Sequence, residues 1–251
     1  MALYQYIKIY PKKKRSYQGL SFMFMAIGTI ILLWVAWPIL SFQLASETLF
    51  AQTITPIQSG AENLKSELPN IIVAAAENKN VQGFVNGELS DPNLWYPSKP
   101  QKNVVTPVNS YTLSIPKLNI KDVTVTIAGD DLKTSLIHYG GTALPGEYGS
   151  SVIFGHSTLP QLFDPKNYHT IFSTLPTLKP ASNGVDGDEI LIKYDGVTYR
   201  YMIYDMVITK PEDLSSLEQK YDSSNITLVT CVPPGTYWER LNVKARLMPL
   251  E

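Results

Sequence analysis

The chain has 251 residues, of which 44% are hydrophobic and 17% are charged, and its formal net charge is −1. The length permits one or two domains, and the hydrophobic share permits a packed core and argues against a disordered chain. The near-neutral charge gives no sign of a nucleic-acid-binding protein. A single cysteine, Cys231, excludes an internal disulfide and a zinc site built from several cysteines.

Charge is distributed unevenly along the chain. Residues 1–15 contain five basic residues and no acid, residues 16–46 contain no charge, and residues 47–251 contain 16 basic and 22 acidic residues. The uncharged part includes Leu20–Phe42, in which 18 of 23 residues are apolar. A helix of this length spans about 34 Å, enough to cross a hydrocarbon core about 30 Å thick.

This stretch is predicted to be an uncleaved transmembrane anchor. Because basic residues stand only on its N-terminal side, the positive-inside rule places the N-terminus in the cytoplasm and the rest of the chain outside the cell membrane. A cleaved signal peptide is the alternative, but the stretch is longer than the usual h-region and no clear Ala-x-Ala cleavage site follows it. A buried soluble helix is disfavoured because apolar residues cover every face.

The sequence predicts four parts: a basic cytoplasmic tip over residues 1–19, the transmembrane helix over 20–42, a stalk or linker over 43–105, and a globular domain over 106–251. Within the stalk, Ala61–Lys79 favours one or two short helices. Asn86–Pro100 is rich in Gly, Pro, Asn and Ser, which indicates irregular structure.

From about Tyr111 the pattern is that of an all-β domain. Strand signals occur in five segments: Val123–Ala128, Gly187–Tyr194, Val197–Ile208, Ile226–Cys231 and Leu241–Leu247. Asp195-Gly196 separates two of them and is a strong hairpin signal. At least six strands with short connections predict a closed barrel or a sandwich. One helix is predicted from Asp130 to Gly140, and Pro211–Gln219 favours another short one.

Cys231 is the first candidate for chemistry. It ends an apolar strand and is followed by Val232-Pro233-Pro234-Gly235, a loop that stops the strand and leaves the thiol at a rim. Catalytic groups are concentrated at such positions. The alternative is that Cys231 is a small buried apolar residue, as free cysteines often are.

A nucleophilic cysteine needs a base or a cationic partner, because the thiolate is the reactive form. Of the three histidines, His156 also ends a strand, His138 lies in the predicted helix, and His169 lies in a polar insertion. His156 is favoured, since two strand ends can meet at one rim of a barrel.

Acyl transfer also needs a group that stabilises the oxyanion. Arg240 opens the last strand nine residues after Cys231, and a turn between them would bring it beside the thiol. The alternative is a solvent-facing arginine, because alternation along the strand sets Arg240 on the same polar face as Asn242 and Lys244.

Four segments resemble the sortase family: HYGGTALPGEYGSSVIFGHS at 138–157, IFSTLPTLKPASNGVDGDEILIKYDGVTYRYMI at 171–203, TLVTC at 227–231 and CVPPGTYWERLNV at 231–243. They carry the family's histidine-ending strand, its F-x-x-L…G-D…Y-x-Y pattern, its TLxTC signature and its downstream arginine. The resemblance covers about Tyr111–Leu247, and the single N-terminal anchor fits it.

This resemblance implies a closed β-barrel with short helices and a transpeptidase. Cys231 would attack an LPxTG-like sorting motif of a secreted protein between Thr and Gly. Arg240 would stabilise the oxyanion, and His156 would protonate the leaving amine. The thioester would pass to an amine of a cell-wall peptide or a pilin lysine. Leu228 and Thr230 would shape the substrate groove. Besides these partners only the lipid bilayer is implied, with no cofactor and no nucleic acid.

Pilin-building sortases often carry a lid with an Asp-Pro-aromatic motif that covers the cysteine. Here Asp91-Pro92 is followed by Asn93, and Trp95 comes two residues later, so an ordinary stalk turn is favoured over a lid. Many pilin-building members also have a C-terminal membrane segment, and no such segment stands before Glu251. Both features favour a non-polymerising type.

Calcium-responsive sortases use a cluster of acids. Asp186, Asp188 and Glu189 are close together, but a solvated hairpin end explains them equally well, and no obligatory metal is predicted. Two other functions stay open: a thiol hydrolase on the same scaffold, and a non-enzymatic binding module on a stalk.

Overall fold

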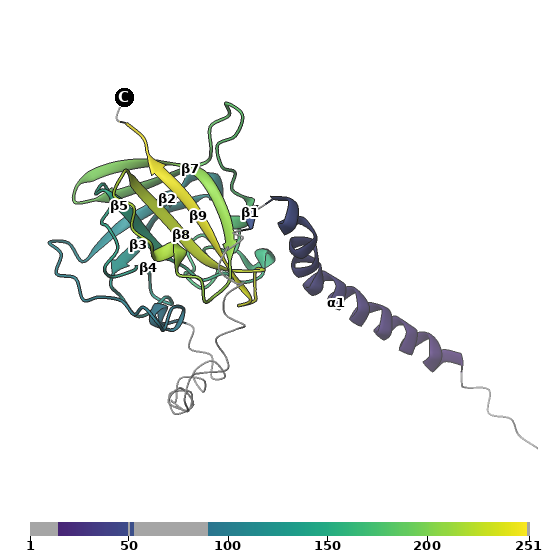
Figure 1. Ribbon diagram of the computed structural model, residues 1–251. Coiled ribbons are helices and arrows are strands. Elements are labelled where there is room, and N and C mark those ends of the chain that lie inside the picture. Colours follow the sequence, from purple (N-terminus) through teal and green to yellow (C-terminus); the bar gives the residue numbers. More distant parts are fainter. Residues whose placement is uncertain (1–14, 50, 53–89, 250–251) are drawn as a thin grey trace, which may run out of the picture.

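The computed structural model describes residues 15–49, 51–52 and 90–249. Its first element is the helix α1, Arg15–Leu49, which contains the predicted anchor and continues beyond it (Figure 1). Within α1, Gly19–Ser46 has a mean hydropathy of 2.2 and is long and apolar enough to cross a membrane. The helices predicted within Ala61–Lys79 lie outside the described residues.

The remaining elements are strands and short 3-10 helices (Figure 1). The strands are β1 Ala51–Gln52, β2 Ser110–Ile115, β3 Ile120–Ile127, β4 Leu136–His138, β5 Gly149–Phe154, β6 Glu189–Tyr194, β7 Val197–Thr209, β8 Ser224–Val232 and β9 Glu239–Leu247. The 3-10 helices are Pro92–Leu94, Pro116–Leu118, Pro160–Leu162, Leu175–Thr177 and Ser215–Leu217.

Eight strands close into a barrel. Their order is β7-β6-β2-β3-β4-β5-β8-β9, and the pairing of β9 with β7 closes the ring. The short β1 adds in parallel to β7. Closure removes the free edges that an open sheet would expose. The predicted closed β-barrel behind an N-terminal apolar helix is confirmed.

The hairpin signal at Asp195-Gly196 is confirmed in its backbone conformation. Asp195 has φ 47° and Gly196 has φ 76°, so both central residues lie in the left-handed region that a type I′ turn requires. The turn joins β6 to β7 and sets Tyr194 opposite Val197.

Side chains alternate between two hydrophobic clusters, one inside the barrel and one on its outer face. On β8, Ile226 and Leu228 belong to the inner cluster, whereas Val229 and Cys231 belong to the outer one. This period of two follows from the pleat of a strand. It determines which residues of β8 can reach a site on the outer face.

The helix predicted from Asp130 to Gly140 is wrong. Turns occupy its first half, and β4 forms the second half, pairing in parallel with β3 and antiparallel with β5. A short apolar run buried between two strands has no polar face to mark its period, so its sequence does not distinguish strand from helix. Within Pro211–Gln219 only the 3-10 turn Ser215–Leu217 forms.

The folded unit also begins before the predicted boundary at residue 106. The N–H of Leu132 donates to the carbonyl of Ser90 at 2.9 Å, and the N–H of Lys102 donates to the carbonyl of Gly140 at 3.0 Å. Residues 90–102, assigned by the sequence to the stalk, are therefore held on the barrel.

Acid is expected to weaken the fold through His138. The ring is 1% exposed, and its Nδ1 and Nε2 bond to the Tyr111 hydroxyl at 2.8 Å and to Thr142 Oγ1 at 3.1 Å. Burial lowers the pKa of His138 to about 4. The unfolded chain, with a histidine pKa near 6.5, therefore binds protons first, and stability present above pH 6.5 falls as the pH drops to 4.

The expected loss from this residue is about 3 kcal/mol in the free energy of unfolding. Urea unfolding at pH 7, 5 and 4 measures it. His138→Gln lowers stability at every pH but flattens the dependence between pH 6.5 and 4. An unchanged pH dependence in this variant would contradict the assignment.

Candidate active site

Cys231 and Arg240 face each other across the β8–β9 hairpin. In the connecting turn, the N–H and Oγ1 of Thr236 both donate to the carbonyl of Pro233, at 2.9 and 2.8 Å. The ladder pairs Cys231 directly with Arg240. Both residues are only 2% exposed. The alternative of a solvent-facing Arg240 is therefore wrong.

His156 follows the end of β5, which runs parallel to β8. Two side-chain hydrogen bonds tie these strand ends together. Thr230 Oγ1 donates to the carbonyl of Gly155 at 2.8 Å, and Ser157 Oγ donates to the carbonyl of Cys231 at 2.6 Å. These bonds involve both neighbours of His156 along the chain, so they hold the histidine at the rim where β8 ends.

The turn predicted at Asp91 forms, and it brings an aromatic side chain to the site. The Asp91 carboxylate accepts hydrogen bonds from the N–H and the Nδ2 of Asn93, at 2.8 and 2.9 Å, and caps the 3-10 helix Pro92–Leu94. This helical turn carries Trp95 onto the barrel, where it is 1% exposed. The expectation of an ordinary stalk turn is therefore wrong, and residues 91–96 are called the cover below.

The cover contacts both partners of the candidate nucleophile. Arg240 Cζ lies 5.0 Å from the centroid of the Trp95 ring, in the range of a cation–π interaction. The ring centroids of Trp95 and His156 are 6.2 Å apart. Tyr96 is also 1% exposed and accepts a hydrogen bond from Ser216 Oγ at 3.0 Å. The site is closed in this conformation.

The two aromatic residues of the cover belong to the outer hydrophobic cluster. The barrel residues of this cluster on β5, on β8 and in the β7–β8 connection are Val152, Phe154, Leu217, Val229 and Cys231. The Trp95 ring meets Phe154 edge-on, with centroids 5.3 Å apart and an interplanar angle of 90°. We call this apolar strip, which ends at Cys231, the groove.

Leu228 and Thr230, predicted to contact the substrate, lie on the other face of β8. Both are 0% exposed, and Leu228 belongs to the inner cluster. Thr230 holds the Gly155 carbonyl and so positions His156. Strand parity sets Val229 and Thr227, rather than these two residues, on the face of Cys231. Contact of Leu228 or Thr230 with a substrate stays an untested prediction.

Burial determines the charge of the closed site. It raises the pKa of the Cys231 thiol to about 11, although the Arg240 guanidinium acts to lower it. Burial, with a smaller contribution from the nearby His169, lowers the pKa of His156 to about 4. Near neutral pH the closed site therefore holds a neutral thiol and a neutral imidazole.

Two nitrogen atoms at the site have no hydrogen-bond partner among the described residues. They are His156 Nε2 and Arg240 Nε, and both atoms are buried. Another nitrogen of Arg240, Nη1, donates to the carbonyls of Tyr237 and Glu239 at 3.2 and 3.3 Å, which fixes the guanidinium. The side chain thus keeps a free donor in a fixed orientation, which is what oxyanion stabilisation requires.

His169 is a neighbour that the sequence did not connect with the site. Its ring stacks on that of His156, with centroids 5.8 Å apart and an interplanar angle of 7°. It lies in the polar insertion between β5 and β6, and nothing in the local pattern links it to His156. Only the fold of that insertion brings the two rings together.

Two of the three acids considered for calcium, Asp188 and Glu189, have other partners. Asp188 Oδ2 accepts from the N–H of Lys179 at 2.8 Å, and Glu189 lies 3.3 Å from Arg200 Nε. Within the described part of the chain, no group of three His, Cys, Asp or Glu side chains is placed to hold a metal ion.

Removing the large ring of the cover is expected to activate the thiol. In Trp95→Ala, less burial lowers the pKa of Cys231 from about 11, and thiolate becomes accessible near neutral pH. Alkylation by iodoacetamide at pH 8 is expected to be roughly tenfold faster or more.

Trp238→Ala is the matched control, because Trp238 lies in the β8–β9 connection that follows Cys231 but is 60% exposed. Its alkylation rate should equal that of the unmodified chain. Equal rates in Trp95→Ala and the unmodified chain would show that Trp95 does not protect the thiol.

Comparison with known proteins gives the family. The sortase domain model matches residues 113–248, more than half of the chain. Similar solved structures include the Clostridium perfringens sortase D5 transpeptidase, at 26% identity over 59% of this chain and 83% of that chain, with a TM-score of 0.47. Sortase C-1 from Actinomyces oris is 29% identical over 58% of this chain and 76% of that one, with a TM-score of 0.48.

A lid mutant of sortase A from Corynebacterium diphtheriae is 28% identical over 59% of this chain and 74% of that one, with a TM-score of 0.48. A comparison with curated proteins found no match. Because the sortase domain model matches more than half of the chain, the protein belongs to the sortase family and is a cysteine transpeptidase.

Proposed function

We propose that this protein cleaves an LPxTG-like sorting motif of secreted proteins between Thr and Gly and transfers them to an amine of the cell wall. The observation that carries this proposal is the pair of buried nitrogens without hydrogen-bond partners among the described residues, His156 Nε2 and Arg240 Nε, at the rim near the end of β8, where Cys231 lies. They supply one proton-transfer group and one oxyanion donor to a single nucleophile.

The first half-reaction uses the groove. Once the cover moves, an extended peptide lies along Phe154 and Val229 and presents its Thr carbonyl to Cys231. The thiol proton passes to His156 as sulfur bonds to the carbonyl carbon, and Arg240 stabilises the oxyanion. The C–N bond then breaks, and the imidazolium protonates the leaving Gly amine, so that a thioester stays on Cys231.

The proposed topology follows the charge of the chain. Residues 1–19 lie in the cytoplasm and residues 20–42 cross the membrane. The predicted linker of residues 43–105 follows, with its residues 90–102 held on the barrel, and residues 106–251 form the catalytic domain outside. The basic tip and the uncharged span support this orientation. Protease added to intact cells should remove the barrel and leave the N-terminal tip protected.

A pilin-polymerising role is the second candidate, and the cover favours it. Trp95 packs on Arg240 and His156, so the displaced aromatic residue no longer argues for a non-polymerising type. Acceptor competition separates the two roles: triglycine and a lysine-containing peptide are offered together, and the ratio of products identifies the preferred amine.

The test of the function uses the full chain in detergent micelles with a fluorogenic LPxTG-like peptide. Intact-mass spectrometry should show a thioester adduct, and product analysis should show amide product when triglycine is added. Release of acid alone in the presence of triglycine would identify a hydrolase instead. Absence of any adduct or cleavage across a library of related motifs would refute the proposal.

A further inference from the structure

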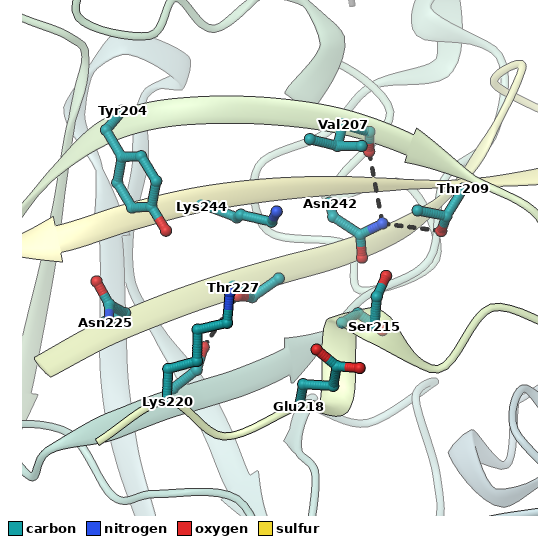
Figure 2. A pocket seen from close by; sticks show the side chains of 12 residues that line it. Tyr204, Val207, Thr209, Ser215, Glu218, Lys220, Asn225, Thr227, Asn242 and Lys244 are labelled. Carbon is teal, nitrogen blue, oxygen red and sulfur yellow. Dashed lines mark hydrogen bonds between the residues drawn. The ribbon is translucent and has the colours of Figure 1, made fainter. Parts of the chain in front are cut away.

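A polar pocket of about 310 Å³ lies on the outer face of the barrel (Figure 2). Its floor is formed by strands β5, β7, β8 and β9, and its wall by the β7–β8 connection. The lining residues used below are Asn225, Thr227, Asn242, Lys244, Glu218 and Lys220. The volume is at the lower end of the range of small-ligand sites.

The pocket approaches the candidate nucleophile along β9. Asn242 lines the pocket and pairs with Val229, and two residues earlier on the same face Arg240 pairs with Cys231. Two residues of a strand span about 7 Å. A ligand in the pocket is therefore about one extended dipeptide from the thiol.

The 3-10 turn Ser215–Leu217 separates the pocket from the groove. Leu217 belongs to the cluster that contains the cover, whereas Ser215 and Glu218 line the pocket. The same face of the barrel thus offers two sites that approach Cys231. One is apolar and filled by Trp95 and Tyr96, and the other is polar.

Asn242 presents an unused acceptor to this pocket. It is 1% exposed, and its Nδ2 donates to Thr209 Oγ1 at 3.0 Å and to the Val207 carbonyl at 3.4 Å (Figure 2). Because a carbonyl only accepts, these bonds fix which end of the amide is nitrogen. Its Oδ1 is buried and has no partner among the described residues.

Asn225 repeats this arrangement at the far end of the pocket. Its Nδ2 donates to the carbonyl and Oγ of Ser223, at 3.2 and 2.9 Å. Its buried Oδ1 also has no partner in the described ranges. Buried acceptors are normally hydrogen-bonded, so both oxygens call for N–H donors.

The asparagine oxygens of the pocket favour a ligand that donates N–H groups, whereas its lysines favour a ligand with a negative charge. Lys220 and Lys244 reach it from the loop and from β9, against one carboxylate, Glu218 (Figure 2). Asp205 already lies 3.4 Å from the Lys244 ammonium. Lys220 is exposed, with its side chain extending toward Thr227. An N–H donor and a carboxylate in one ligand describe a peptide.

We propose that this pocket binds the second substrate, a short peptide with a free amine, through an N–H bond to Asn242 Oδ1 and a carboxylate contact to Lys220. The inference rests on the proposed function. The peptide amine attacks the thioester carbonyl and gives a proton to His156. A C–N bond forms, the C–S bond breaks, and the Cys231 thiolate takes the proton back from the imidazolium.

The experiment pairs protein variants with acceptor analogues, using the full chain in micelles and the LPxTG-like donor. The acceptors are triglycine, its C-terminal amide and Gly-sarcosine-Gly, which lacks the second N–H. The unmodified chain should show a KM for triglycine roughly fivefold or more below those of both analogues. Lys220→Ala should remove the preference over the amide, and Asn242→Leu the preference over the sarcosine peptide.

Lys210→Ala is the matched control, because Lys210 is an exposed lysine of the same connection that does not line the pocket. It should keep both preferences. Each readout is the ratio of the KM values of two acceptors in the same variant, so a smaller folded fraction does not change it. Lys220 is exposed and tolerates truncation, so the test stands even where Asn242→Leu folds poorly.

If Lys220→Ala and Asn242→Leu both still prefer triglycine over its amide and over the sarcosine peptide, the inference is overturned. A thioester adduct in the same experiment would leave the proposed function intact. Equal KM values for the three acceptors in the unmodified chain would overturn it as well, since the pocket would then hold only water. No adduct in the unmodified chain would overturn the proposed function and this inference with it.

Discussion

Replacing Cys231 with alanine is expected to abolish cleavage of the sorting peptide, with a fall of at least about 10,000-fold in kcat/KM. The chain has no second cysteine to take over the nucleophilic role. The attack that forms the thioester needs this sulfur, and neither His156 nor Arg240 replaces it. Release of fluorescence from the peptide and the mass of the acyl adduct measure the effect.

The fold should survive this change. Cys231 is 2% exposed and makes no disulfide, so its truncation removes one buried sulfur atom. The melting temperature of Cys231→Ala is therefore expected to stay within a few degrees of the original. Cys231→Ser is the isosteric control and should be nearly as inactive. Turnover by a well-folded Cys231→Ala chain at the normal rate would exclude the cysteine mechanism.

Replacing Arg240 with alanine is expected to lower kcat by about 100- to 1,000-fold, the cost of losing one oxyanion donor. Its Nε is the unpaired donor, and its guanidinium is held by the Tyr237 and Glu239 carbonyls. Arg240→Lys keeps the charge but loses the planar donor set, so it should recover little activity.

Arg246→Ala provides the matched control for this prediction. Arg246 lies on the same strand and stacks 5.1 Å from the Tyr204 ring, as Arg240 does on Trp95. Its loss should leave kcat within about twofold of the original. A thiol titration adds a second measurement, because removing Arg240 takes away the positive charge that lowers the pKa of Cys231. Equal kcat values for the two alanine variants would rule out an oxyanion role.

Features that depend on a short-range pattern can be predicted from the sequence alone. An uncharged apolar run is enough to predict α1, because a membrane span needs only length and hydrophobicity. Asp195-Gly196 is enough to predict a hairpin, because few residues adopt positive φ at two successive positions. The sequence pattern also predicts that Cys231 and His156 lie at strand ends, and the turn predicted after Cys231 places Arg240 opposite it.

Contacts between segments far apart in the sequence follow only from the folded barrel. Trp95 lies over Arg240, and His169 stacks on His156, although no local pattern predicts either contact. His138 lies on a strand because β3 and β5 supply its hydrogen bonds, whereas a short apolar run alone fits helix and strand equally.

The two faces of β8 show most clearly what the sequence pattern cannot predict. Alternation alone sets Leu228 and Thr230 on one face and Val229 and Cys231 on the other, but it does not say which face is the barrel interior. Closure of the ring between β7 and β9 settles that, because it turns one face of each strand inward. The sequence could therefore identify the nucleophile, while only the closed barrel could identify the surface around it.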